Sequence, residues 1–322
     1  MRARIAGAAS AVAFLATAAF VPGGALAGTP WGADYFPNVP LVNQDGVVLR
    51  FYDDVIKGKA VAVNLMYTHC TASCPLETAK MAQVQKLLGD RVGKDIFFYS
   101  ITIDPKRDTP EVMKAYMQRY HIAAGWQFLT GREEDIKLVA AKLGLSSLTD
   151  AANRDGHQPS LMVGNEATGQ WMRNSAVDNA RFLATMIGNF LGWKSDKAAP
   201  KYADLSAAPR ALGKGAYLFN TRCSACHTVG RGDAVGPDLA NISKRRSRAW
   251  LSSYLTDADK MLTAGDPIAT ELFAKYKGVR MPTLGLDQDE IAALLAHIDS
   301  QTGTASARKG SASTGGAGSG RP

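Results

Sequence analysis

The stretch VAVNLMYTHCTASCPLETAKMAQVQKLL, residues 61–88, decides the fold of the first half of the chain. Its opening residues, 61–66, form an apolar run, as expected for a strand buried on both faces of a sheet. Pro75 is favoured in the first turn of a helix, and residues 76–88 carry helical periodicity. The stretch therefore predicts a buried strand, a short loop that carries Cys70, and a helix.

The same alternation of strands and helices continues to about residue 194. Thr109 suits the N-cap of a helix whose first residue is Pro110. Alternating elements of this kind predict an α/β layer fold around a mostly parallel sheet. Further strands are expected at 96–103, 126–129 and 160–163, and further helices at 133–143 and 176–191.

The length and composition limit the classes of protein to which the chain can belong. With 322 residues, the chain suggests two domains or one large one. Its 46% hydrophobic and 20% charged residues exclude a wholly disordered or collagen-like chain. Its four cysteines are too few for a disulfide-stapled mini-protein.

Residues 1–27 read as a signal peptide for export. Arg2 and Arg4 form a basic start, residues 5–21 are apolar, and residues 25–27 form a small-residue cleavage site. An uncleaved anchor is the alternative reading, although a run composed mostly of alanine is a marginal membrane span. We expect a periplasmic protein.

The remaining chain divides into two domains. Residues 30–194 are expected to form the α/β domain and residues 195–209 a polar linker. Residues 210–302 are expected to be all-helical, and residues 303–322 to be a disordered tail rich in Gly and Ser. Helices are expected at 212–220, 248–256, 268–276 and 291–300, the last with a capping box of Asp287 and Glu290.

The formal net charge of +8 includes one compact basic cluster. This cluster is either a solvated helix start or a docking patch for an acidic redox partner or an anionic lipid surface. Nucleic acid is not expected as a partner, because the protein is exported and no aromatic residues interleave the basic run. The cluster consists of Lys244, Arg245, Arg246 and Arg248.

The second cysteine pair is C-x-x-C-H, formed by Cys223, Cys226 and His227. This spacing is that of c-type haem attachment. Two thiols add to the two vinyl groups of the porphyrin, and the imidazole of the next residue reaches the iron. A chance match or a thiol redox pair is the alternative.

The surroundings of this motif resemble a class I cytochrome c over residues 210–300. Gly213 and Gly215 precede the motif, residues 236–239 (GPDL) follow it, and Met281 stands before Pro282. The resemblance implies one covalent haem c with His227 and Met281 as axial ligands, a pair suited to electron transfer. Met261 is the rival ligand, and His297 is expected to be structural.

The first cysteine pair, Cys70 and Cys74, stands between a predicted strand and the start of a helix. The helix dipole and its free N–H groups stabilise thiolate there. Two thiolates one helical turn apart can chelate a soft ion such as Cu(I) or form a disulfide. A purely structural disulfide is the alternative.

These residues resemble the SCO/SenC family of copper proteins that serve cytochrome oxidase assembly. The similarity rests on residues 67–75 (YTHCTASCP), on residues 100–110 (SITIDPKRDTP) and on His157. It implies a thioredoxin-like fold and one copper ion held by Cys70, Cys74 and His157. It also implies a partner in the dinuclear copper site of cytochrome oxidase or a related enzyme.

The roles of several residues near the first cysteine pair, and the function of the whole chain, have more than one interpretation. Asp104 is expected near the copper site, and His69 is expected to be structural or to support the ligands. Pro159, just before a strand, adds weight to thiol–disulfide chemistry, because thioredoxin-like oxidoreductases have a cis-proline near this place. The alternatives are a thiol–disulfide oxidoreductase fed electrons by the haem, a peroxidase, and a plain electron shuttle.

Overall fold

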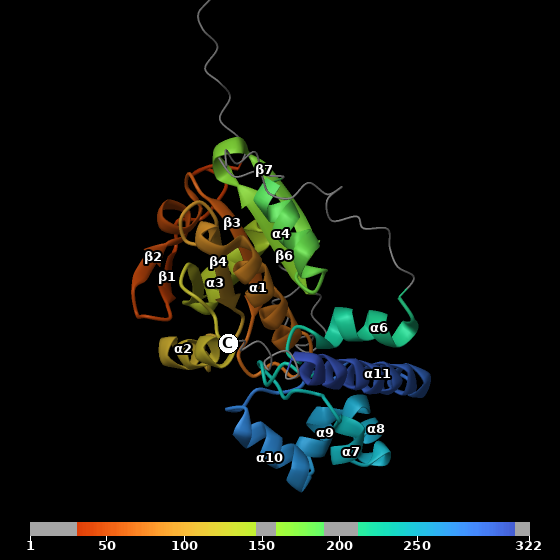
Figure 1. Ribbon diagram of the computed structural model, residues 1–322. Coiled ribbons are helices and arrows are strands. Elements are labelled where there is room, and N and C mark those ends of the chain that lie inside the picture. Colours follow the sequence, from red (N-terminus) through yellow and green to blue (C-terminus); the bar gives the residue numbers. More distant parts are fainter. Residues whose placement is uncertain (1–30, 146–158, 190–211, 313–322) are drawn as a thin grey trace, which may run out of the picture.

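The computed structural model describes residues 31–145, 159–189 and 212–312, with side chains to residue 302. The first half contains a seven-stranded sheet with helices on both sides (Figure 1). In spatial order the strands are β2 (Val48–Arg50), β1 (Pro40–Asn43), β5 (Trp126–Thr130), β4 (Phe97–Thr102), β3 (Ala60–Met66), β6 (Ser160–Asn165) and β7 (Gln170–Ser175).

The sheet is mixed. Strands β3, β4 and β5 are parallel, and all the other pairs of the described sheet are antiparallel. The hairpins β1–β2 and β6–β7 turn at Gly46 (φ 79°) and Gly169 (φ 70°), where glycine tolerates positive φ. The α/β class is confirmed, but the expected mostly parallel sheet is limited to the three central strands.

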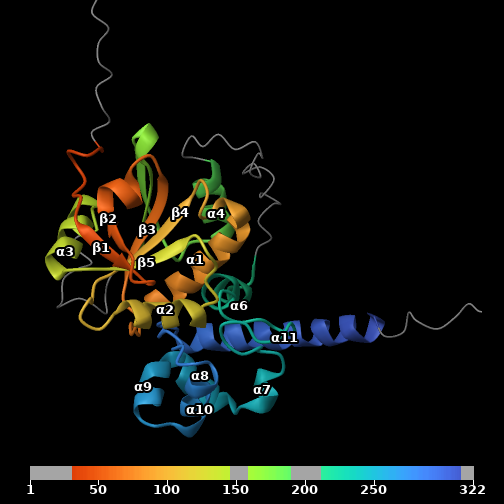
Figure 2. The same ribbon diagram turned by 90° about the vertical axis from the view of Figure 1, so that its left-hand side faces the viewer.

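Four helices cover this sheet: α1 (Cys74–Leu88), α2 (Pro110–Arg119), α3 (Glu133–Lys142) and α4 (Ala180–Asn189). Helices α1 and α4 pack together, and α3 lies on the opposite side of the sheet (Figure 2). Thr109 caps α2 by accepting the N–H of Val112, as expected. The helix expected at 176–191 begins later, at Ala180, because residues 176–179 form the turn that follows β7. Strand β7 is an edge strand that the sequence pattern did not reveal.

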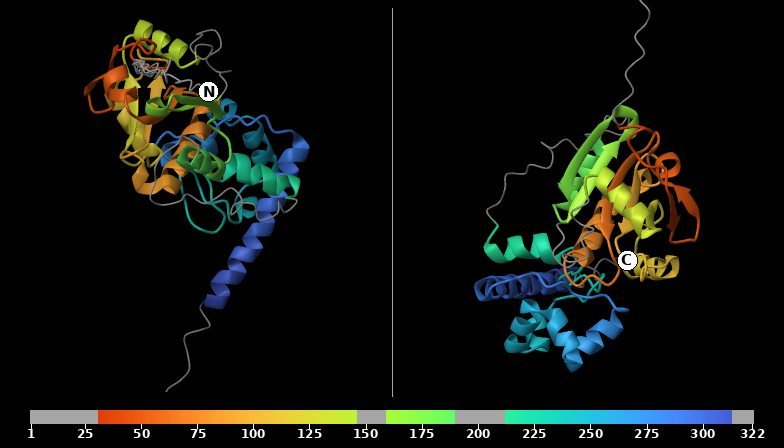
Figure 3. Two further views of the ribbon diagram at one scale, coloured as in Figure 1. Left: turned by 90° about the horizontal axis from the view of Figure 1, so that it is seen from above. Right: turned by 180° about the vertical axis from the view of Figure 1, so that it is seen from behind.

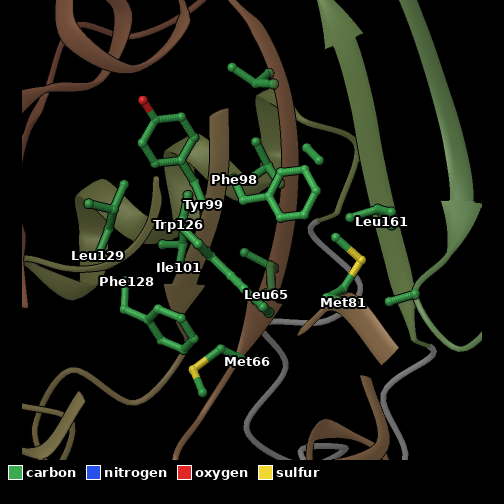
Figure 4. Close-up of a cluster of buried hydrophobic side chains, with 14 of the residues drawn as sticks. Leu65, Met66, Met81, Phe98, Tyr99, Ile101, Trp126, Phe128, Leu129 and Leu161 are labelled. Atoms are coloured by element: carbon green, nitrogen blue, oxygen red, sulfur yellow. The ribbon is translucent and has the colours of Figure 1, made fainter. Parts of the chain in front are cut away.

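The core between α1 and the sheet fixes the position of the cysteine loop. Met81 of α1 lies beside Leu161 of β6 and near Leu65 of β3 (Figure 4). All three side chains are almost fully buried. Because α1 is anchored in this way, its first residue, Cys74, has a defined place at the end of β3.

The second half is helical, as predicted. It contains a π-helical turn (Phe219–Cys223) and six helices, α6 (Lys214–Leu218), α7 (Ile242–Arg245), α8 (Arg248–Thr256), α9 (Ala258–Thr263), α10 (Pro267–Lys275) and α11 (Gln288–Ala312). Helices α6 and α11 lie side by side (Figures 1 and 3). A Cβ at Gly215 would stand 2.0 Å from the carbonyl oxygen of Ala293, so only glycine permits this crossing.

Helix α11 is longer than expected. Its N-terminus has the predicted capping box, in which Asp287 and Glu290 each accept the other's backbone N–H, at 2.7 and 3.2 Å. The helix then continues to Ala312, through residues expected to belong to a disordered tail (Figure 3). Extending an existing helix is far easier than nucleating one, and no proline interrupts these alanine- and lysine-containing residues.

Two expected segments, the signal peptide at 1–27 and the linker at 195–209, lie outside the described residues. Within the described part of the chain, none of the helices combines the length and apolar character needed to cross a bilayer.

Candidate metal and haem sites

The thiols of Cys70 and Cys74 are buried at the N-terminus of α1. Cys70 lies in the loop after β3 and is 2% exposed, and Cys74 is the first residue of the helix and is fully buried. Both are free cysteines. Strand β3 ends in the sheet centre at Met66, so the loop carries both sulfur atoms to the carboxyl edge of the parallel strands.

The two thiols differ in acidity, because a hydrogen bond between them favours the charged form of Cys70 and the neutral form of Cys74. The Cys74 thiol and the backbone N–H groups of Cys74 and Ala72 stabilise the Cys70 thiolate and lower the pKa of Cys70 to about 6. The Tyr67 side chain contributes in the same direction. Burial, followed by the neighbouring Cys70, raises the pKa of Cys74 well above its usual value. The pair therefore presents one thiolate and one thiol donor in a dry pocket.

Asp108 braces the cysteine loop. It is fully buried, and its carboxylate accepts the backbone N–H of Thr68 at 3.1 Å and the Thr68 hydroxyl at 2.6 Å. It also accepts the hydroxyl of Thr102, the last residue of β4, at 2.5 Å. The sequence alone suggested no role for Asp108, although it lies in the 100–110 segment. The presence of a charged residue in this motif was the one sign that it could matter.

His69 and Asp104 lie beside the cysteine loop, as expected. The His69 Nε2 is 3.1 Å from an Asp104 oxygen, and that oxygen also accepts the Arg107 guanidinium at 2.6 Å. His69 and Cys70 line the same pocket. The imidazole is thus held by carboxylates at the rim of the site, which agrees with a supporting role.

The third expected copper ligand, His157, lies outside the described residues. Among the residues that the structure does describe, no group of three or more His, Cys, Asp and Glu side chains could hold a metal ion. The described part of the site is therefore the sulfur pair alone, which suits a soft ion such as Cu(I).

His227 is oriented by its neighbours in the second domain. Its Nδ1 is 2.9 Å from the carbonyl oxygen of Pro237, which leaves Nε2 for a metal. A Cβ at Gly236 would stand only 2.7 Å from Cε1 of the ring, so glycine makes room for this orientation. The GPDL segment at 236–239 thus supplies the carbonyl group that orients His227 and leaves room for the imidazole ring.

A largely apolar cavity of about 840 Å³, including its open mouth, lies next to His227. Cys223, Cys226, His227 and Met281 all line it, whereas Met261 does not. The donor set, the cavity and the Gly236 cradle fit a covalently attached haem with His227 and Met281 on the iron.

The two cysteine pairs differ in chemistry. Burial raises the pKa of the Cys223 and Cys226 thiols to about 12. A thiol redox pair needs a thiolate, and the acidic thiol of this chain is Cys70 instead. The difference in thiol acidity between the two pairs favours covalent haem attachment, rather than thiol–disulfide exchange, at the C-x-x-C-H motif.

Other ring side chains of this domain pack against one another or line the cavity. Trp250 and Tyr254 stack with ring centroids 4.7 Å apart. Tyr254 and Tyr276 line the cavity wall. The His297 ring packs 5.7 Å from that of Phe219 where α11 meets the attachment segment.

The basic cluster is only partly available to a partner. Lys244, Arg245 and Arg248 are exposed, and Arg246 is half-buried. Arg245 donates to the carbonyl oxygens of Asp238 and Ala240, at 2.6 and 3.0 Å. Part of the cluster thus supports the loop that follows the GPDL segment.

The two sites adjoin one another, which the sequence did not indicate. A pocket of about 540 Å³ is lined by Cys70 and Tyr120 of the first domain and by Phe273 and Val279 of the second. Leu76 of α1 lines the haem cavity itself. Phe273 and Val279 line both this pocket and the haem cavity, so the two sites share part of their walls.

Two family models match the chain. The SCO1/SenC family model matches residues 33–162, and the cytochrome c family model matches residues 212–302. A SCO2-like protein of Rickettsia felis is 31% identical over 147 residues, which cover 44% of this chain and 68% of the relative. The chain belongs to the SCO1/SenC family and carries a cytochrome c domain after its thioredoxin-like domain.

Solved structures align with the first domain. A SCO1/SenC family lipoprotein of Bacillus anthracis is 25% identical, with a TM-score of 0.39, and the match covers 48% of this chain and 92% of that protein. ScoI of Bradyrhizobium japonicum, solved with copper bound, is 21% identical, with a TM-score of 0.38, and the match covers 48% and 99%.

Proposed function

We propose that the chain is a periplasmic copper chaperone with a built-in haem, and that it delivers copper to the dinuclear copper site of cytochrome oxidase or a related enzyme. Cys70, Cys74 and His157 hold the copper. Membership of the SCO1/SenC family supports this function, as do the relatives named for copper and the thiol pair at the start of α1.

The observation that carries the proposal is the pair of buried thiols, Cys70 and Cys74, at the N-terminus of α1. A thiolate is present near neutral pH because the pKa of Cys70 is about 6. Cu(I) can then bind by displacing the Cys74 proton, so that two thiolates replace one thiolate and one thiol. Both thiols are buried, and Cys70 also lines the pocket between the two domains.

The second domain contributes redox chemistry. When bound, the haem would supply electrons one at a time. One electron reduces Cu(II) to Cu(I). Two successive electrons, with two protons, reduce a Cys70–Cys74 disulfide to the dithiol. The Pro237 carbonyl group orients His227, and His227 and Met281 would hold the haem iron.

Copper transfer tests the chaperone function. The full chain loaded with Cu(I) is mixed with the apo form of the soluble copper-binding domain of an oxidase subunit, and the copper in each protein is measured after separation. We expect copper to move to the acceptor, and we expect Cys70→Ser to abolish both loading and transfer. Retention of all the copper by the loaded chain would refute delivery.

A second candidate is a thiol–disulfide oxidoreductase that keeps the cysteines of a copper enzyme reduced. The opposed pKa shifts of Cys70 and Cys74 favour it, because an acidic attacking thiol beside a protonated resolving thiol is typical of such enzymes. This candidate predicts reduction of a disulfide substrate without copper. The activity should survive His157→Ala and be lost in Cys74→Ser.

A further inference from the structure

One face of α1 is turned toward the haem-attachment segment. Leu76, Lys80 and Gln83 follow the i, i+4, i+7 spacing of a helix stripe. Leu76 lines the haem cavity, Lys80 Nζ donates to the carbonyl oxygen of Asn220 at 3.3 Å, and Gln83 Nε2 donates to that of Ser224 at 3.0 Å. The stripe thus tracks the turn that bears Cys223 and Cys226.

Lys80 stands out in this stripe because it is a buried cation. It is only 3% exposed, and burial lowers the pKa of its ammonium group. The groups that interact with its charge are Cys226, Cys223 and Asp178. Within the described residues, none of the carboxylates forms an ion pair with Lys80 at 4.0 Å or less.

Thioether formation changes what this cation faces. Once Cys223 and Cys226 are bonded to a haem, neither sulfur can ionise, so no negative sulfur can balance the ammonium. A buried charge that lacks an ion-pair partner is costly and acts strongly on nearby groups, because low-polarity surroundings screen it little. Asp178 then remains as the charged group that acts on the ammonium, and the haem fixed by Cys223 and Cys226 is a redox group beside it whose charge changes.

We propose that Lys80 is a haem-tuning residue, through which the copper domain raises the reduction potential of the haem held by the second domain. Ferric haem carries one more positive charge than ferrous haem. A neighbouring ammonium therefore disfavours the ferric form and stabilises the ferrous form. The inference rests on the proposed haem attachment, and it makes the potential dependent on contact between the two domains.

A redox titration of the full chain, followed by haem absorbance, tests the proposal. Lys80→Met and Lys80→Gln remove the charge, and the glutamine can still donate to Asn220. Lys80→Arg keeps the charge, because arginine remains protonated in proteins. Lys86→Met is the matched control, since it removes an exposed lysine from the same helix.

Both neutral variants are expected to lower the midpoint potential, raising the ferric-to-ferrous ratio at the wild-type midpoint by about tenfold, which corresponds to about 59 mV for one electron. Lys80→Arg and Lys86→Met should stay near wild type. The difference between Lys80→Met and wild type should persist at high salt, because a buried charge is poorly screened.

Three results would overturn the proposal. The first is a wild-type midpoint in either neutral variant with an unchanged haem spectrum, and the second is an equal shift in Lys86→Met. The third is failure of both neutral variants to fold while Lys80→Arg folds, which would assign Lys80 a structural role. A chain without attached haem would instead show no c-type spectrum, and would contradict the proposed function.

Discussion

The side-chain amide of Gln83 donates a 3.0 Å hydrogen bond to the carbonyl oxygen of Ser224. Gln83 belongs to the helix that begins at Cys74, and Ser224 stands between the two haem-attachment cysteines. The bond therefore ties the element that positions the thiol pair to the turn that would hold the haem. The fused chain thus has a direct contact between the helix of the thiol pair and the C-x-x-C-H turn.

The acidity of Cys70 should depend on Cys74. The alkylation rate of Cys70 in the reduced chain should rise with pH around a midpoint of about 6 and then level off, because the thiolate is the reactive form. In Cys74→Ala the midpoint should move upward, since the main donor to that thiolate is lost. Mass spectrometry of the Cys70 peptide measures both rates. An unchanged midpoint in the variant would show that Cys74 does not stabilise the thiolate.

Asp108→Asn should destabilise the first domain by about 1–3 kcal/mol, the usual cost of leaving a buried polar group without its partner. The carboxylate accepts three hydrogen bonds from Thr68 and Thr102, and an amide has only one acceptor oxygen. Urea unfolding followed by circular dichroism measures the loss. Asp90→Asn, at a fully exposed side chain, is the control and should change stability by less than about 0.5 kcal/mol. Equal effects of the two variants would refute the bracing role of Asp108.

Met281→Ala should lower the haem potential, because methionine opposite histidine raises it. Met261→Ala should leave it unchanged, since Met261 does not line the cavity. Potentiometric titration of the two full-length variants compares them directly. The opposite ranking would identify Met261 as the ligand.

Gly215→Ala should weaken the crossing of α6 and α11. The new Cβ would meet the Ala293 carbonyl oxygen at 2.0 Å, and overpacking of this kind costs about 1–3 kcal/mol. Lys214→Ala, at the exposed neighbouring position, should stay within about 0.5 kcal/mol of wild type. Thermal unfolding followed by haem absorbance makes the comparison. A tolerated Gly215→Ala would mean that the helices can separate freely.

The sequence predicted those parts of the fold whose signals are local. The apolar run of β3, the proline at the start of α1 and the capping box of α11 each act within one turn or strand, and each appears where expected. The spacing of the cysteines within each motif was enough to predict the chemistry of that motif. The edge strand β7 was missed because residues 170–175 show no clear alternation of polar and apolar residues.

What the sequence did not reveal depends on contacts between distant segments. Lys80 and Gln83 are polar residues on a helix, and such residues normally face water. Lys80 is nevertheless buried, and it donates to the carbonyl oxygen of Asn220, 140 residues away. Asp108 likewise takes its role from Thr68, 40 residues away, which no local pattern encodes.

Copper titration of the full chain tests the central claim most directly. Reduced protein with its haem attached is titrated anaerobically with Cu(I), and bound copper and iron are counted in the same sample. The account predicts one copper per haem, loss of that copper when Cys70 and Cys74 are both replaced by serine, and weaker binding in His157→Ala. Absence of stoichiometric copper in the wild-type chain, or equal copper in the double serine variant, would contradict it.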